Sequence, residues 1–207
     1  MQYLSNLKVP YININTYDAG QANKEIEMLY LDSAKTFDAC ADEANSSSIT
    51  SSCSQILTYR TYKYNDILSV VVISGGQSTA PWVLEYNIYN FDLTTGNLLD
   101  YDSLLTKTGY DKNETLAKMK NLLKNKMDEL WGKHADMSNA CGYDGLYFDY
   151  TGTSCYEKAN EILEDSIEDD SVLFFVNNEG NLNILTIPFY SGVQNGEMNK
   201  YLFEVAK

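Results

Sequence analysis

The chain has 207 residues, of which 44% are hydrophobic, and carries 29 acidic residues against 15 basic ones for a formal net charge of −14. This length and composition fit a globular protein with a core of its own, and the charge argues against nucleic-acid binding, which requires a basic face. No apolar run approaches the roughly 20 residues that span a bilayer. The negative charge fits simple solubility or the capture of a cationic partner.

The amino-terminal region predicts a long helix over residues 18–45. Asp18, with Gln21 three positions later, has the form of a capping box. Apolar and small residues then recur at helical spacing and predict one core-facing stripe. This stripe consists of Ile26, Leu29, Tyr30, Ser33, Phe37 and Ala41.

Three strands are expected next, over residues 55–64, 67–73 and 82–93. They are rich in β-branched and aromatic residues, and Asn65-Asp66 is a favourable turn pair between the first two. Because the connections are too short for a crossover, the pattern predicts an antiparallel meander. Residues 74–81, here called the seam, separate the second and third strands with eight mostly small and polar residues. A hairpin needs only about two to five.

The second half of the chain predicts two helices, a hairpin and a last strand. One helix begins near Asp111, where Glu114 repeats the capping spacing, and the other runs from Ser154 to about Ile167. Residues 132–153 between them are irregular. The hairpin strands are expected at 172–176 and 182–187, and the terminal strand at 201–205.

This order of elements predicts an α+β fold with segregated helices and strands. We expect an antiparallel meander packed against the long N-terminal helix and two further helices, with a closing hairpin. The chain is predicted to be a single domain over residues 1–207. Its helix-and-meander half covers residues 1–105, and its helices-and-hairpin half covers residues 106–207.

Four segments, taken in series, carry a resemblance to one bacterial family. They are KVPYININTYDAGQANKEIEML (8–29), YRTYKYNDILSVVVIS (59–74), YNIYNFDLTTGNLLDYDSLL (86–105) and VLFFVNNEGNLNILTIPFY (172–190). The third is the strongest match, to a family stretch of the form YN-x-DLKTG-x-x-L-x-L-x-DL. The chain resembles the extracytoplasmic domain shared by RsiV-type anti-sigma factors and the amino-terminal module of PdaC-type peptidoglycan deacetylases.

The seam departs from this family in one respect. The family loop usually reads Gly-Gly-Ala-His-Gly, whereas this chain has Gly75-Gly76-Gln77-Ser78-Thr79 and lacks the histidine. Any role of that ring in the family therefore does not carry over to this chain. The glycines are retained, which is typical of backbone that needs a positive φ or a close approach.

Catalytic and metal-binding patterns are not found in the sequence. The single histidine, His134, lies just past the second predicted helix, where a surface position is the usual case. Without a Ser-His-Asp set, a histidine pair or a Cys-x-x-Cys motif, hydrolase, zinc and redox sites lack their residues. We therefore expect no enzyme activity, no metal and no cofactor.

The four cysteines permit three pairings, and free buried thiols in a cytosolic protein are the alternative. Cys40 pairing with Cys53, and Cys141 with Cys155, would each close a loop of about 14 or 15 residues, worth roughly 3 kcal/mol in the chain-entropy model. Because the resemblance implies a location outside the membrane, we favour these two local disulfides.

The resemblance implies a non-catalytic sensor domain. RsiV-type proteins capture lysozyme, which licenses proteolysis of the anti-sigma factor and releases an extracytoplasmic-function sigma factor. A cationic envelope-active protein such as lysozyme is the expected partner of this acidic chain. The alternative is a secreted module that binds cell-wall glycan or peptidoglycan without signalling.

We expect a monomer outside the cytoplasm, with no nucleic-acid partner and with membrane contact only through a segment absent from this chain. Loops carried on a rigid sheet are the usual place for recognition, and Tyr and Trp are usual anchors. The predicted contact loops are the seam region and an aromatic insert. Their residues are Gly75, Gly76, Gln77, Ser78 and Trp82, and Tyr143, Tyr147 and Tyr150.

Overall fold

The computed structural model describes residues 3–46, 53–77, 83–131, 155–168, 172–185 and 202–206. Helices and two separate sheets confirm the α+β fold class. The chain divides into two compact units, one built mainly from Met1–Leu99 with Phe175–Glu179, and the other mainly from Asp100–Phe174 and the later strands.

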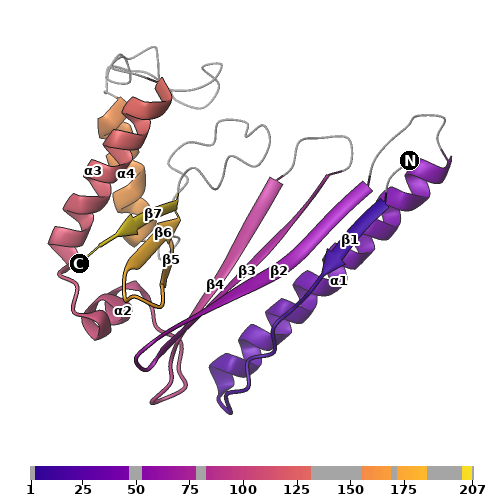
Figure 1. Ribbon diagram of the computed structural model, residues 1–207, viewed down its shortest axis with the longest axis horizontal. Coiled ribbons are helices and arrows are strands. Elements are labelled where there is room, and N and C mark those ends of the chain that lie inside the picture. The colour runs from indigo at the N-terminus through magenta and orange to yellow at the C-terminus, as the bar shows by residue number, and fades with distance from the viewer. Residues whose placement is uncertain are drawn as a thin grey trace. The chain divides into compact units, whose positions relative to one another are not determined.

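The first unit contains one long helix and a four-stranded sheet. Its elements are β1 (Tyr3–Leu7), α1 (Tyr17–Ser46), β2 (Cys53–Tyr64), β3 (Ile67–Gln77) and β4 (Val83–Asp92). The strand order is β1-β2-β3-β4, and α1 runs along this sheet (Figure 1). The antiparallel meander of β2, β3 and β4 is confirmed, and the edge strand β1 pairs with β2 in parallel.

The start of α1 differs from the predicted capping box. The helix begins at Tyr17, and the Thr16 hydroxyl accepts a hydrogen bond from the Ala19 backbone N–H at 3.4 Å. The Asp18 carboxylate instead accepts the Leu98 backbone N–H at 2.9 Å. The cap is therefore a threonine one residue before the helix, since its side chain reaches the third helical N–H.

The core of the first unit lies between one face of α1 and one face of the sheet. Small side chains at Ala19 and Ala22 let the helix approach closely, and Ile26, 2% exposed, fills the centre. The cluster also contains Leu57, Val70, Val72, Tyr89 and Phe91 from the strands. Of the predicted stripe, Ile26 is confirmed as core, but Tyr30 is 40% exposed and does not belong to it.

The first half of the seam is a strand rather than a loop. β3 continues to Gln77, with Gly76 opposite Gln55 on β2 and Val83 on β4. Glycine is disfavoured in strands unless another group needs the space. Here the Gln55 side chain occupies the place of a Gly76 Cβ, which would also lie 3.0 Å from the Ser54 carbonyl oxygen. Residues 78–82 lie outside the described part of the chain.

The return segment Phe175–Glu179 packs on the first unit, to which it belongs. The Phe175 ring stacks on Tyr62 with centroids 4.9 Å apart. Ser69, fully buried, donates to Asn90 Oδ1 at 2.7 Å and accepts the Val176 backbone N–H at 3.2 Å. The polar atoms of this buried serine are thus satisfied on both sides, as burial requires.

The second unit contains three helices and most of a three-stranded sheet of order β5-β6-β7, in which β6 and β7 are antiparallel. Phe175 and Val176, the last two residues of β5, are part of the first unit. The two predicted helices and the hairpin strands are confirmed, whereas α2 was not expected. The elements are α2 (Tyr101–Thr108), α3 (Lys112–Trp131), α4 (Cys155–Glu168), β5 (Leu173–Val176), β6 (Leu182–Leu185) and β7 (Leu202–Val205).

Local capping explains where α2 and α3 begin and end. The Asp100 carboxylate accepts the Ser103 N–H at 2.7 Å, and Gly109 ends α2 with a left-handed φ of 75°. The pKa of Asp100 is lowered by its hydrogen bonds from Ser103. Asp111 then caps α3 by accepting the Glu114 N–H at 2.9 Å, as the capping spacing predicted.

None of the helices in the described ranges is long and apolar enough to cross a membrane.

Candidate functional site

The contact between α1 and the sheet changes from apolar to polar along the helix. Ile26 meets the apolar core, but about two to three turns later Ser33 and Thr36 face small or polar strand residues. Ser74 on β3 stands opposite Glu85 on β4, and both lie on the side of the sheet that α1 covers. Small side chains fill little space, so the helix and sheet leave a pocket here.

This pocket has a volume of about 340 Å³. Its apolar lining comes from Leu29 and Phe37 on α1, and most of the remaining lining is polar. The described residues that line it are Leu29, Asp32, Ser33, Thr36, Phe37, Cys40, Ser54, Gln55, Ser74, Gly75, Gly76 and Glu85. Two of these residues are carboxylates, and none of the described lining residues is a lysine or an arginine.

Two serines in the lining are deeply buried. Ser33 is 5% exposed and Ser74 is 6% exposed. Neither hydroxyl has a hydrogen-bond partner among the described residues, and neither oxygen is sealed from solvent. Buried polar groups normally have a partner from the protein or from water. These hydroxyls are therefore available to a ligand that enters the pocket.

The carboxylates of the pocket come from its two walls. Asp32 projects from α1 and Glu85 from β4, and both residues are exposed. Within the described part of the chain, neither carboxylate forms an ion pair. The pocket therefore combines negative charge that no ion pair offsets with side chains that can accept hydrogen bonds.

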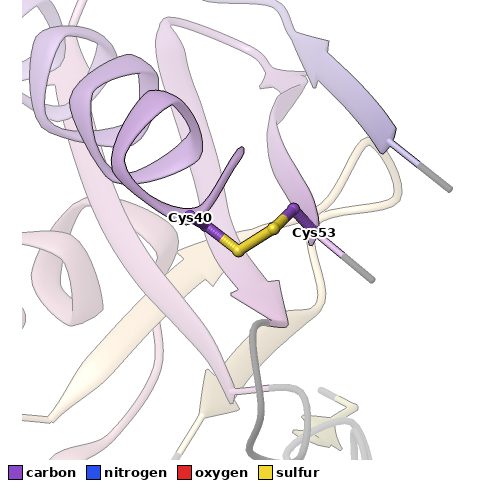
Figure 2. Close-up of a disulfide and its surroundings, with 2 residues drawn as sticks. All are labelled: Cys40 and Cys53. Carbon is purple, nitrogen blue, oxygen red and sulfur yellow. A yellow bond between two sulfur atoms is a disulfide. The ribbon is translucent and has the colours of Figure 1, made fainter. Parts of the chain in front are cut away.

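A disulfide forms part of the pocket wall. Cys40 on α1 is bonded to Cys53 at the start of β2, with their Cα atoms 5.9 Å apart (Figure 2). The predicted pairing of these two cysteines is confirmed. Because Cys40 lines the pocket, this cross-link ties the helix to the sheet where the apolar core has ended.

The pocket lies on an acidic flank of α1. Asp18, Glu25 and Asp32 recur at seven-residue intervals, which places them on one side of the helix because seven residues make nearly two turns. We call these three residues the acidic ridge. It is about 21 Å long at 1.5 Å per residue. The helix has seven acidic residues and two lysines, Lys24 and Lys35, and neither lysine forms an ion pair among the described side chains.

The middle of the acidic ridge is fixed to the sheet. The Tyr89 hydroxyl donates to Glu25 Oε2 at 3.1 Å. Burial raises the pKa of Tyr89, and the negative charge of Glu25 and this hydrogen bond raise it further. Tyr89 therefore stays protonated and continues to donate at physiological pH. The ridge thus has a fixed position relative to β4.

The structure places only some of the predicted contact residues. Gly75 and Gly76 line the pocket, and Gln77 ends β3 with its side chain outside the described set. The other predicted contacts and the second cysteine pair depend on residues outside the described ranges. These are Ser78, Trp82, Tyr143, Tyr147 and Tyr150, with Cys141 and the side chain of Cys155.

Among the side chains that the structure describes, no group of three or more histidine, cysteine or acidic residues could hold a metal ion. His134 lies outside the described residues.

Sequence reasoning missed the pocket acids and the amide that lies over Gly76. The seven-residue spacing of Asp18, Glu25 and Asp32 was visible in the sequence and could have indicated the acidic ridge. That Glu85 lines the same pocket as Asp32 could not be inferred from the sequence. It depends on the strand register and on which face of the sheet α1 covers.

No family model and no curated protein matches this chain.

Proposed function

We propose that this chain is a non-catalytic, extracytoplasmic recognition domain that binds a cationic protein, with lysozyme as the first candidate. The observation that carries the proposal is the acidic ridge, which continues into a pocket whose described lining has two carboxylates and no basic side chain. Surfaces of one charge sign attract partners of the opposite sign and speed their capture. The net charge of −14 extends the same effect over the whole chain.

The disulfide supports a location outside the cytoplasm. Structural disulfides form and persist in oxidising compartments and are rare in the cytosol. Cys40 and Cys53 are bonded to each other in the first unit, which bears the acidic ridge. The binding surface is therefore proposed to act in the bacterial envelope or outside the cell.

The resemblance to RsiV-type anti-sigma factors supports a sensing role. In this proposal, capture of the cationic protein is the signal, and a segment outside this chain passes it on by releasing a sigma factor. A cell-wall glycan is the competing ligand, since the resemblance extends to a module of peptidoglycan deacetylases.

Calorimetric titration of the domain with lysozyme tests the proposal. We expect binding at low salt that weakens at ~0.15 M salt, where exposed charges more than about 8 Å apart are screened. Lysozyme with succinylated lysines, which carries carboxylates in place of ammonium groups, should not bind. Absence of binding to native lysozyme at either salt would contradict the partner, and binding of chitin oligomers in its place would favour the glycan.

Two matched double variants test whether the acidic ridge is the contact. Glu25→Gln with Asp32→Asn removes two charges from the ridge, and Glu27→Gln with Asp38→Asn removes two exposed charges from the opposite flank of α1. We expect the ridge variant to weaken lysozyme binding by about tenfold, which corresponds to about 1.4 kcal/mol. The control variant should change it by less than about threefold. Equal effects would show that net charge alone is recognised.

A further inference from the structure

We propose that the pocket between α1 and the sheet is a guanidinium-binding site that receives one arginine side chain of the cationic partner. The identity of the partner rests on the proposed function, but the choice of guanidinium rests on the pocket lining. The relevant residues are Asp32, Glu85, Ser33, Ser74 and Phe37, all of which line the pocket.

The hydrogen-bonding groups of the pocket match a ligand that is rich in donors. An ionised carboxylate only accepts hydrogen bonds, so Asp32 and Glu85 offer acceptors alone. The hydroxyls of Ser33 and Ser74 add lone pairs and have no partner in the described residues. A guanidinium group presents five N–H donors in a plane and no acceptor. It can therefore satisfy both walls of the pocket at once.

The charge of the pocket selects a cation over a neutral sugar. Two carboxylates line the pocket, and its described residues include no lysine or arginine. A neutral ligand would remove water from these carboxylates without compensating their charge, which costs free energy. A cation offsets that cost, and charge-assisted hydrogen bonds to carboxylates are the stronger kind.

The apolar residues suit the rest of an arginine side chain. Phe37 is partly buried and lines the pocket together with Leu29 and Cys40. The planar guanidinium of arginine stacks on aromatic faces, whereas the ammonium of lysine is a compact point charge. The aliphatic stem of arginine packs along apolar surface. The volume of about 340 Å³ is near the lower end of ligand pockets, about 300 to 1,000 Å³. This size fits one side chain better than an oligosaccharide.

An NMR titration with N-acetyl-L-arginine amide tests the site without the partner protein. The backbone amides of Ser74, Gly75 and Gly76 on β3 should shift and saturate with a Kd of about 1 to 10 mM, as expected for a ligand of this size. N-acetyl-L-citrulline amide has nearly the same shape but no charge and should cause at least tenfold weaker shifts. Equal binding of the two probes would overturn the assignment.

Matched variants separate the pocket from general acidity. Asp32→Asn with Glu85→Gln should weaken binding of the arginine probe at least tenfold, whereas Glu27→Gln with Asp38→Asn should leave it within twofold. All four positions are exposed, so both variants should fold, and the dispersion of their amide spectra checks this. An equal loss in the control variant would refute a specific pocket. Shifts of the same β3 amides by chitin oligomers but not by the arginine probe would assign the pocket to glycan.

The same measurements distinguish failure of this inference from failure of the proposed function. If the arginine probe binds the pocket but lysozyme does not bind the domain, the guanidinium site holds and lysozyme is the wrong partner. If lysozyme binds but the pocket variant does not weaken it and the probe does not bind, the partner holds and the guanidinium site is wrong.

Discussion

Breaking the disulfide between Cys40 and Cys53 should destabilise the first unit by about 3 kcal/mol. The bond joins residues 13 positions apart. In the chain-entropy model, a loop of about 14 residues loses roughly 10 cal/mol/K of closure entropy, which is about 3 kcal/mol at 25 °C. The polar contact between this end of α1 and the sheet offers little apolar burial to compensate. The effect should therefore be close to the full entropic value.

Urea denaturation followed by circular dichroism measures this effect. The background is Cys141→Ala with Cys155→Ala, so that dithiothreitol acts on one cysteine pair only. With a denaturant slope of about 2 kcal/mol/M, a loss of 3 kcal/mol lowers the midpoint by roughly 1.5 M urea.

The control is a variant that also carries Cys40→Ala and Cys53→Ala. It should match the reduced background protein in its midpoint and be insensitive to dithiothreitol. If reduction leaves the midpoint of the background protein unchanged, the disulfide does not hold α1 to the sheet. That result would refute the reasoning.

Three further predictions concern single positions. Gly96→Ala should lower the unfolding free energy measured in urea by about 2 to 3 kcal/mol, because φ is +76° and a Cβ would lie 2.5 Å from the methyl group of Thr16, the N-cap of α1. Gly109→Ala, at φ +75° with open space, should lower it by about 1 kcal/mol. Ser69→Ala should lower the unfolding free energy by about 1 to 3 kcal/mol, because it leaves the Val176 N–H without its partner. The control variant Ser69→Thr, which retains the hydroxyl, should lose less stability. Burial and then the charge of Asp102 raise the pKa of Tyr101 to about 12. The stability that the protonated hydroxyl contributes is fully present below pH 10 and is lost as pH rises towards 12. The unfolding free energy of Tyr101→Phe should therefore fall less steeply with pH in this alkaline range. Equal losses of stability at Gly96 and Gly109 would contradict the first prediction, and an unchanged urea midpoint of Ser69→Ala would contradict the second. A pH profile of Tyr101→Phe equal to that of the wild type would contradict the third.

The long helix and the meander could be predicted from the sequence because each rests on local periodicity. The stripe around Ile26 and the turn pair Asn65-Asp66 specify these elements without knowledge of the rest of the fold. The same holds for the start of α3, where Asp111 and Glu114 meet as the capping spacing predicted. Local rules succeeded where local contacts determine the structure.

The remaining elements depend on contacts between distant residues. β1 is five residues long and forms only by pairing with β2, which is some 50 positions away in the chain. The continuation of β3 through Gly76 depends on the Gln55 side chain that lies over it. α2 has eight residues, which is too short for a clear helical period, and its start depends on the Asp100 side chain that accepts the Ser103 N–H.

The candidate site shows the same division. The cysteine pairing could be favoured from loop length together with the resemblance, and the bond is present. The pocket requires Asp32 from the helix and Glu85 from the sheet, and it exists because Ser33 and Ser74 are too small to fill the space between them. Which strand face meets the helix is a property of the tertiary fold, so this site could not be read from the sequence.

The most direct test of cationic-partner recognition is the association rate of lysozyme with the domain as a function of salt. Stopped-flow measurements would compare the wild-type chain with the ridge variant Glu25→Gln/Asp32→Asn. For the wild type we predict a rate constant that falls at least tenfold between low salt and ~0.15 M salt, because steering by opposite charges is screened. The ridge variant should start from a lower rate and show a shallower salt dependence. An association rate that is independent of salt, or the absence of any association, would contradict the proposal.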